Sequence, residues 1–256
     1  MPIDRRALLA VVLGLLLLPG CGDGPGEQGE ISVGAAASLR RVLPDLIERY
    51  RGDHPGAAFR VTYASSGTLR TQIEAGAPID GTLLASERDV DQLVERGHAE
   101  ADSRTVVARN VLVLVAGPES PATSIADLPS LPAKARVAIG APGSAPVGRY
   151  ARDLLRGRGL WDGLQEHLVF ARDVSAVVAY VRRGEAAAGF AYATDARDVP
   201  ELQVLEIADG ADDPTPLIVG VAVKQAPGAA EFRSFLGWLA TPDAREVLAA
   251  HGFGAP

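Results

Sequence analysis

Four short segments of the sequence place hydroxyl groups or backbone N–H groups at the expected start of a helix. They are AAAS (35–38), ASSGT (64–68), APVG (145–148) and RDV (172–174). The first turn of a helix has N–H groups without helical partners and about half a positive charge, so it attracts anions. Because open α/β sheets bind ligands where strands end and helices begin, this pattern indicates an anion-binding site.

Each of these positions also has a purely structural explanation. Ser38, and Ser65 or Ser66, could serve only as helix N-caps, a position that favours serine. Asp173 is expected to be a cap rather than a ligand group, since a carboxylate repels an anion. Tyr192 follows a predicted strand and could pack there with its hydroxyl satisfied. The binding hypothesis therefore depends on all these positions meeting in one place.

The sequence shows no pattern typical of catalysis. The histidines are scattered and have no metal-ligand spacing, and neither a GxSxG motif nor a P-loop occurs. These histidines are His54, His98, His167 and His251. The acidic residues lie mainly on polar helix faces, without a pair placed for acid–base chemistry. We therefore predict a binding protein that is not an enzyme and has no cofactor.

Short apolar strands alternate with amphipathic helix patterns along the chain. The expected strands are 31–35, 59–63, 81–85, 111–116, 137–140, 189–192, 202–207 and 217–223. The expected helices are 39–50, restarting at Pro44, then 66–75, 90–96, 146–156, 162–167, 174–181, a helix through 232–239, and 242–250. This alternation predicts an α/β fold with mainly parallel sheets.

Length and charge restrict the function further. The 256 residues, 47% hydrophobic and 22% charged, are typical of a globular chain and suit one two-lobed unit or two modest domains. The net charge is −7, and the sequence contains no block of basic residues. We therefore predict that the protein does not bind nucleic acid.

The N-terminal segment has the features of an export signal. In residues 1–20, Arg5 and Arg6 precede an apolar run that is too short to span a membrane comfortably. The following sequence, LPGC (18–21), resembles a bacterial lipobox, so we expect acylation of Cys21. Residues 21–29 are rich in glycine and predict a flexible tether. We expect an exported protein on the periplasmic or cell-surface face, anchored to the membrane by a lipid on Cys21.

Several longer motifs together resemble one family. They are VGAAASL (33–39), YASSGTLRTQIEAGAPID (63–80), AIGAPGSAPVGRYARDLL (138–155) and FARDVSAVVAYVRRGEAAAGFAYATDA (170–196). In this order they resemble the periplasmic molybdate-binding proteins of bacterial ABC importers, which have the type II solute-binding fold. The resemblance implies two lobes, each a mainly parallel sheet flanked by helices, joined by two hinge strands. Residues 30–109 and 221–256 are expected in lobe 1, and residues 110–220 in lobe 2.

The resemblance also implies a function and a set of binding residues. A monomer would capture molybdate, and also tungstate, between its lobes and deliver it to a membrane permease. Molybdenum would be held only as its oxyanion. The implied donors are the hydroxyls of Ser38, Ser66 and Tyr192 and the backbone N–H groups of Ala85, Val147 and Val174.

The sequence departs from the family at three positions that bear on the ligand. Leu84 and Ser86 replace a serine and an aspartate near the expected pocket edge, and Gly220 replaces a proline in the expected hinge strand. Another oxyanion such as sulfate, or an organic anion, therefore remains an alternative ligand. A sensory ligand-binding domain is a further alternative, although the export signal argues against a cytosolic regulator.

The chemistry of molybdate fits donors without charge. Molybdate is a dianion without protons at neutral pH, so N–H and O–H groups satisfy its oxygens. Hydrogen phosphate keeps one proton, and burying that proton without an acceptor costs about 1–3 kcal/mol. We therefore expect no carboxylate in the pocket and expect Arg70, Arg149 and Arg172 to point outward. Closure about crossings near Asn110 and 217–220 should bring both sets of donors together.

Overall fold

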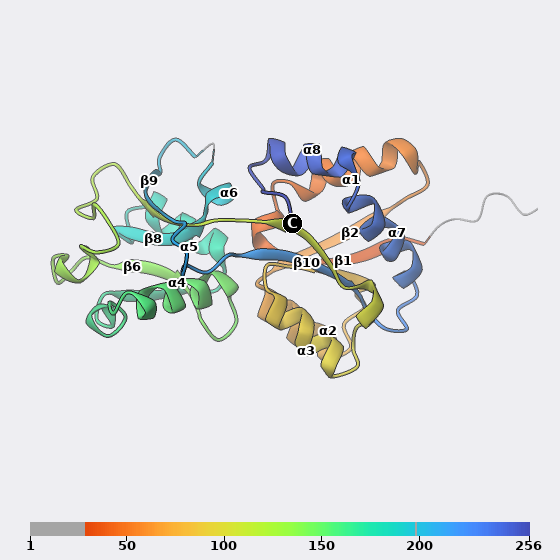
Figure 1. Ribbon diagram of the computed structural model, residues 1–256, viewed down its shortest axis with the longest axis horizontal. Helices are drawn as coiled ribbons and strands as arrows, with labels where there is room; N and C mark the ends of the chain where they lie inside the picture. Colours follow the sequence, from red (N-terminus) through yellow and green to blue (C-terminus); the bar gives the residue numbers. More distant parts are fainter. Residues whose placement is uncertain (1–28, 198) are drawn as a thin grey trace, which may run out of the picture.

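The computed structural model describes residues 29–197 and 199–256. The predicted export signal, Cys21 and the tether before Gly29 lie outside the described residues. The described part of the chain forms two lobes that lie side by side along the longest axis of the molecule (Figure 1). Within that part, no helix has both the length and the apolar character needed to cross a bilayer.

The first lobe is a five-stranded sheet in the order β2-β1-β3-β10-β4, with helices on both faces. Its strands are β1 (Ile31–Ala36), β2 (Phe59–Ala64), β3 (Gly81–Leu84), β4 (Thr105–Arg109) and β10 (Leu217–Ala222). Its α-helices are α1 (Leu43–Asp53), α2 (Ser66–Glu74), α3 (Glu87–Glu95), α7 (Ala229–Leu239) and α8 (Pro242–Ala250). Helices α1, α7 and α8 lie on one side of the sheet, and α2 and α3 on the other (Figure 1). Two 3₁₀ turns, η1 (Ala37–Leu39) and η2 (Ala101–Ser103), complete the lobe.

The second lobe repeats this design with the strand order β7-β6-β8-β5-β9. Its strands are β5 (Leu112–Ala116), β6 (Val137–Gly140), β7 (Leu168–Ala171), β8 (Ala188–Tyr192) and β9 (Gln203–Ala208). Its helices are α4 (Pro146–Gly157), α5 (Val174–Arg182) and α6 (Ala193–Ala196), with 3₁₀ turns η3 (Leu128–Ser130) and η4 (Asp162–Leu164).

The two-lobed α/β fold is confirmed, but the sheets are mixed rather than mainly parallel. In the first lobe, β1 runs parallel to β2 and β3, whereas β10 runs antiparallel to β3 and β4. In the second lobe, β6 runs parallel to β7 and β8, whereas β5 runs antiparallel to β8 and β9. The strands that run antiparallel to both of their neighbours are β5 and β10, and each is the strand by which the chain enters its lobe from the other lobe.

Local sequence accounts for most of these elements. Every residue of β1 and of β5 is buried, which agrees with their uninterrupted runs of small and apolar residues. Pro44 lies in the first turn of α1, where its missing N–H costs no helical hydrogen bond. It therefore separates η1 from α1, as the sequence predicted. Strands β4 and β7 were not predicted, and the predicted helix 162–167 contains only η4. Both missed strands are short and lie at a sheet edge.

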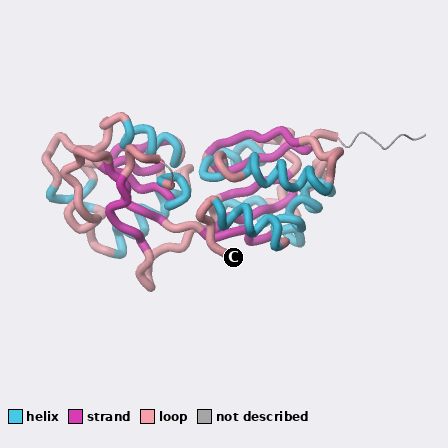
Figure 2. The backbone as a smooth tube through the Cα atoms, turned by 90° about the horizontal axis from the view of Figure 1, so that it is seen from above, coloured by secondary structure: helices cyan, strands magenta, loops and turns pink. Residues whose placement is uncertain are grey.

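The chain crosses between the lobes twice, through the loop segments visible in Figure 2. At the first crossing, the Asn110 N–H donates to Pro216 O at 2.8 Å, and its side chain donates to Thr194 Oγ1 at 2.8 Å. The second crossing lies between β9 and β10, before Leu217. All of β10 belongs to the first sheet. The predicted lobe boundary after residue 220 is therefore too late, because apolar β10 was assigned to the hinge itself.

The lobes are in contact in this structure. The N–H of Gly67, in the first turn of α2, donates to Ser144 O of the second lobe at 2.9 Å. Arg41 of the first lobe donates to Arg197 O of the second. These contacts join segments far apart in the sequence and define a closed arrangement.

Candidate anion-binding site

A small cavity lies between the lobes, where strands of both sheets lead into helices. Its lining consists of Ala36, Ala37, Ser38, Ser65, Ser66, Ala85, Ala145, Pro146, Val147, Asp173, Val174 and Tyr192. All six residues that the family resemblance singled out are in this lining. The structure therefore brings the predicted residues together, and their role in binding stays a prediction.

Two hydroxyl groups at this cavity are buried without a protein partner. Ser38 Oγ and Tyr192 Oη make no hydrogen bond to any described residue. Such buried polar groups are costly unless something pairs with them. Burial also raises the pKa of the Tyr192 phenol well above its ordinary value. Tyr192 therefore stays protonated at neutral pH and can donate its proton to an anion.

The two adjacent serines at the start of α2 have different tasks. Ser65 is the N-cap, and its hydroxyl accepts a hydrogen bond from the Thr68 N–H at 3.3 Å. The hydroxyl of Ser66 accepts one from the Ala85 N–H at 3.0 Å. The Ser66 proton thus remains available to an anion. The Ala85 N–H orients the Ser66 hydroxyl in this structure, and its role as a donor to the ligand stays a prediction.

Two helices direct their first turns at the cavity. Val147 lies in the first turn of α4, whose N-cap residue, Ala145, offers no capping side chain. Val174 is the first residue of α5. First-turn N–H groups have no acceptor within their own helix, so both helices present donors and a partial positive charge to the cavity.

One carboxylate does lie at the cavity, contrary to the expectation of none. Asp173 caps α5, and its Oδ1 accepts from the Ala176 N–H at 2.9 Å. Its Oδ2 lies 3.4 Å from Arg172 Nε. The predicted cap role is confirmed, and the carboxylate is held by its own helix and by the neighbouring arginine.

The lining of the cavity contains no arginine. Of Arg70, Arg149 and Arg172, which were expected to point outward, only Arg172 does so. The side chain of Arg172 is 87% exposed. Arg70 and Arg149 are only 17% and 12% exposed, because both pair with the buried carboxylate of Asp89. Arg149 and Asp89 lie 60 residues apart on different lobes, a pairing that no local sequence pattern indicates.

The residues at which the sequence departs from the family do not obstruct the cavity. Leu84 is fully buried in the core beneath α2 and α3. Ser86 caps α3 by accepting from the Asp89 N–H at 3.2 Å. A Cβ at Gly220 would lie 2.3 Å from Leu236 Cδ2, so packing requires glycine in β10.

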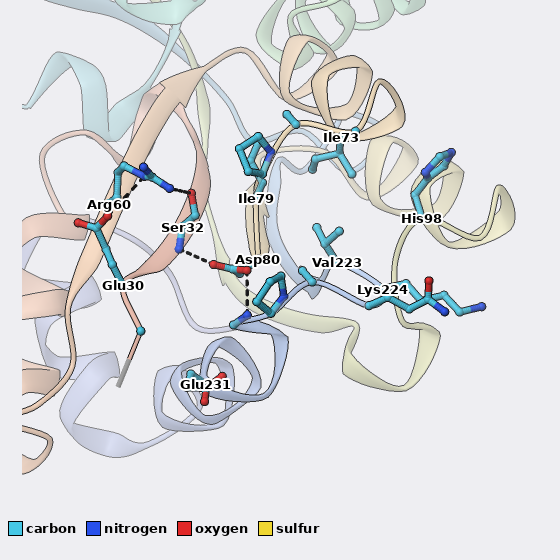
Figure 3. A pocket seen from close by; sticks show the side chains of 18 of the residues that line it. Glu30, Ser32, Arg60, Ile73, Ile79, Asp80, His98, Val223, Lys224 and Glu231 are labelled. Atoms are coloured by element: carbon cyan, nitrogen blue, oxygen red, sulfur yellow. Dashed lines mark hydrogen bonds and ion pairs between the residues drawn. The ribbon is translucent and has the colours of Figure 1, made fainter. Parts of the chain in front are cut away.

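A larger hollow lies at the opposite end of the first sheet and has different chemistry (Figure 3). Its lining includes the acidic residues Glu30, Asp80 and Glu231. The Asp80 carboxylate accepts from the N–H groups of Ser32 at 2.7 Å and Gly228 at 2.9 Å. It therefore ties β1 to the start of α7. The lining also contains the basic residues Arg60 and Lys224, so this hollow carries charges of both signs.

Comparisons with known proteins agree with this arrangement. The family model for bacterial extracellular solute-binding proteins matches residues 31–254. The chain is 33% identical over 238 residues to the molybdate-binding protein ModA of Escherichia coli, covering 91% of each chain. It is 30% identical over 244 residues to ModA of Haemophilus influenzae, covering 94% of this chain and 96% of that protein. The periplasmic molybdate-binding protein of Azotobacter vinelandii superposes with a TM-score of 0.78 at 23% identity, covering 89% of this chain and 100% of that one. The chain therefore belongs to the bacterial extracellular solute-binding proteins, which bind solutes and are not enzymes.

Proposed function

We propose that this protein is the extracytoplasmic component of an ABC importer and captures molybdate between its lobes. The observation that carries the proposal is a pair of buried hydroxyls at the cavity, Ser38 and Tyr192, which have no hydrogen-bond partner among the described residues. Two relatives at 30% and 33% identity are named molybdate-binding proteins, which supports the same ligand.

The donor set accounts for capture of a dianion without a positively charged side chain. Ser38, Ser66 and Tyr192 donate O–H groups, and Val147 and Val174 donate backbone N–H groups. Hydrogen bonds to a charged group contribute roughly 1.5–3 kcal/mol each, so several are sufficient for tight binding. Tungstate has the same charge and nearly the same size, so it binds in the same way.

Closure couples capture to transport. Ser38 and Ser66 belong to the first lobe, whereas Val147, Val174 and Tyr192 belong to the second. An anion that contacts both sets favours the closed arrangement over the open one. A membrane permease then recognises the closed form and receives the anion.

The export signal and the lipobox-like sequence support a location outside the cytoplasm. Acylation of Cys21 anchors the protein to the membrane, and the glycine-rich tether lets the two lobes reach the permease. We propose that the protein acts as a monomer, since one chain supplies every donor of the site.

Calorimetric titration of the purified protein with sodium molybdate tests the proposal. The expected result is saturable binding of one molybdate per chain, and similar binding of tungstate. A protein that releases no heat with either anion, and whose melting temperature neither anion changes, would contradict the proposal.

A further inference from the structure

An ion pair joins the two lobes beside the cavity. Arg149, on α4 of the second lobe, donates to Asp89 Oδ2 and, at 2.8 Å, to Ser86 Oγ of the first lobe. The side chain of Arg149 is 12% exposed and that of Asp89 is 5% exposed. Salt screens a pair this well buried much less than it screens a surface pair.

The other partners of these residues are divided unequally between the lobes. Asp89 also accepts from Arg70 Nε at 3.1 Å, within the first lobe. Arg70 pairs in turn with Glu74. When the lobes separate, Asp89 keeps Arg70, whereas Arg149 loses both of its side-chain partners. The contact of Arg149 therefore exists only in the closed arrangement, and breaking it leaves no uncompensated charge in the first lobe.

The pair lies close to the proposed ligand without contacting it. Arg149 follows Val147 by two residues in the first turns of α4, yet it is not part of the cavity lining. The pKa of Tyr192, raised chiefly by burial, is also lowered by the charge of Arg149 and raised by that of Asp89. Motion of α4 away from the first lobe therefore breaks the ion pair and withdraws an anion donor in one step.

We propose that the pair of Arg149 and Asp89 is a clasp that holds the lobes closed and sets the release rate of the bound oxyanion. The proposal rests on the proposed function for the identity of that ligand. Because the clasp joins protein to protein, it slows the release of molybdate and tungstate alike.

Stopped-flow measurement of molybdate dissociation and association tests the clasp with Arg149→Ala and a matched control, Arg152→Ala. Arg152 is on the same helix and, among the described residues, pairs only with its neighbour Asp153. Both variants lose one positive charge, so both slow association. Loss of a buried charge pair acts on dissociation. We expect Arg149→Ala to release molybdate about 10-fold faster than the wild type, and Arg152→Ala to stay within about 2-fold.

A second variant, Asp89→Asn, separates the clasp from long-range attraction. Removal of a negative charge near the site favours retention of an anion, whereas loss of the clasp accelerates its release. We expect faster release. Equal dissociation rates for Arg149→Ala and Arg152→Ala, or release from Asp89→Asn no faster than from the wild type, would overturn the clasp.

Failure of the proposed function is distinguishable from failure of the clasp. If the wild type binds no oxyanion, the proposed function is wrong, and solution scattering of the ligand-free variants still tests the clasp. A larger radius of gyration for Arg149→Ala than for Arg152→Ala supports it, and equal radii contradict it.

Discussion

Among the side chains of the cavity, the unused hydroxyls carry the chemical argument. The hydroxyls of Ser38 and Tyr192 are buried and have no partner in the part of the chain that the structure describes, whereas Ser65 and Asp173 are occupied as helix caps. The first pair is therefore available to a ligand, and the second pair serves the fold. This difference is measurable, because loss of the Ser38 hydroxyl should lower the affinity for the anion, whereas loss of the Ser65 hydroxyl should lower the folding stability.

Ser38→Ala is expected to weaken molybdate binding about 10-fold or more, since it removes one hydrogen bond to a charged ligand, worth roughly 1.5–3 kcal/mol. Ser65→Ala is the matched control. It removes the cap of α2, which costs about 1 kcal/mol of folding stability, and leaves the affinity nearly unchanged. Calorimetry and thermal melting measure the two effects. Equal loss of affinity in both variants would show that Ser38 has no special role.

Asp195, in α6, predicts a pH dependence of stability. Burial raises the pKa of its carboxyl from 3.8 to about 7, while Arg41 across the lobes opposes this shift. The unfolded carboxyl is ionised at both pH 5.5 and pH 8, whereas the folded one binds a proton as the pH falls. Stability therefore rises on acidification, by about 2 kcal/mol over this interval.

Thermal melts of the ligand-free protein at pH 8 and pH 5.5 check this dependence, with Asp195→Asn as the comparison. The contribution should disappear in the variant, which has no carboxyl to protonate. A variant whose melting temperature changes with pH as much as that of the wild type would assign the effect to other groups.

Sequence alone predicted the positions of the site but not the task of each side chain. Ser65 and Ser66 are adjacent and chemically identical, so only their partners, Thr68 and Ala85, distinguish cap from binding hydroxyl. Arg149 was expected to point outward because neutral donors are sufficient for the anion, and its partner Asp89, 60 residues away in the sequence, was not foreseen. Contacts between residues so far apart leave no periodic pattern.

At the level of helices and strands, the predictions succeeded where one residue type determines the local backbone. Pro44 places the start of α1, and Pro242 that of α8. Strands β4 and β7 were missed; each is the shorter edge strand of its sheet, whereas the longer edge strands β2 and β9 were predicted. The helix starts that matter for the site lie at strand–helix junctions, which explains why their positions were predictable.

Gly67→Ala, in the first turn of α2, is expected to impair closure of the lobes. A Cβ at Gly67 would lie 2.5 Å from Ser144 O of the second lobe, so the closed lobes must separate locally. Molybdate binding should weaken about 10-fold or more, whereas alanine favours the helix itself by about 1 kcal/mol.

Gly237→Ala provides the control for this prediction. A Cβ at Gly237, on α7, meets nothing within 4 Å, so this variant gains helix propensity without affecting closure. Calorimetry compares the two variants. Unchanged affinity in Gly67→Ala would mean that the contact of Gly67 with Ser144 is not part of the bound state.

For the molecule as a whole, the arrangement of two lobes explains how uncharged donors from distant parts of the sequence meet at one cavity. The motifs that resemble the family run from residue 33 to residue 196, through both lobes, so the two-lobed fold was predictable. The second crossing was placed too late because the apolar sequence of β10 was taken for a hinge strand. Only the pairing of β10 with β3 and β4 shows that this strand belongs to the first sheet.

Calorimetry at pH 7 gives the strongest test of a site made only of N–H and O–H donors. It compares the dissociation constants of phosphate and molybdate, with sulfate and tungstate measured alongside. Asp173 is a carboxylate of the cavity lining; its Oδ1 caps α5, and its Oδ2 lies 3.4 Å from Arg172 Nε. If this carboxylate stays with its helix when an anion binds, the proton of hydrogen phosphate has no acceptor, a mismatch of about 1–3 kcal/mol. We predict that phosphate binds at least about 10-fold more weakly than molybdate. Phosphate binding as tight as that of molybdate would contradict it.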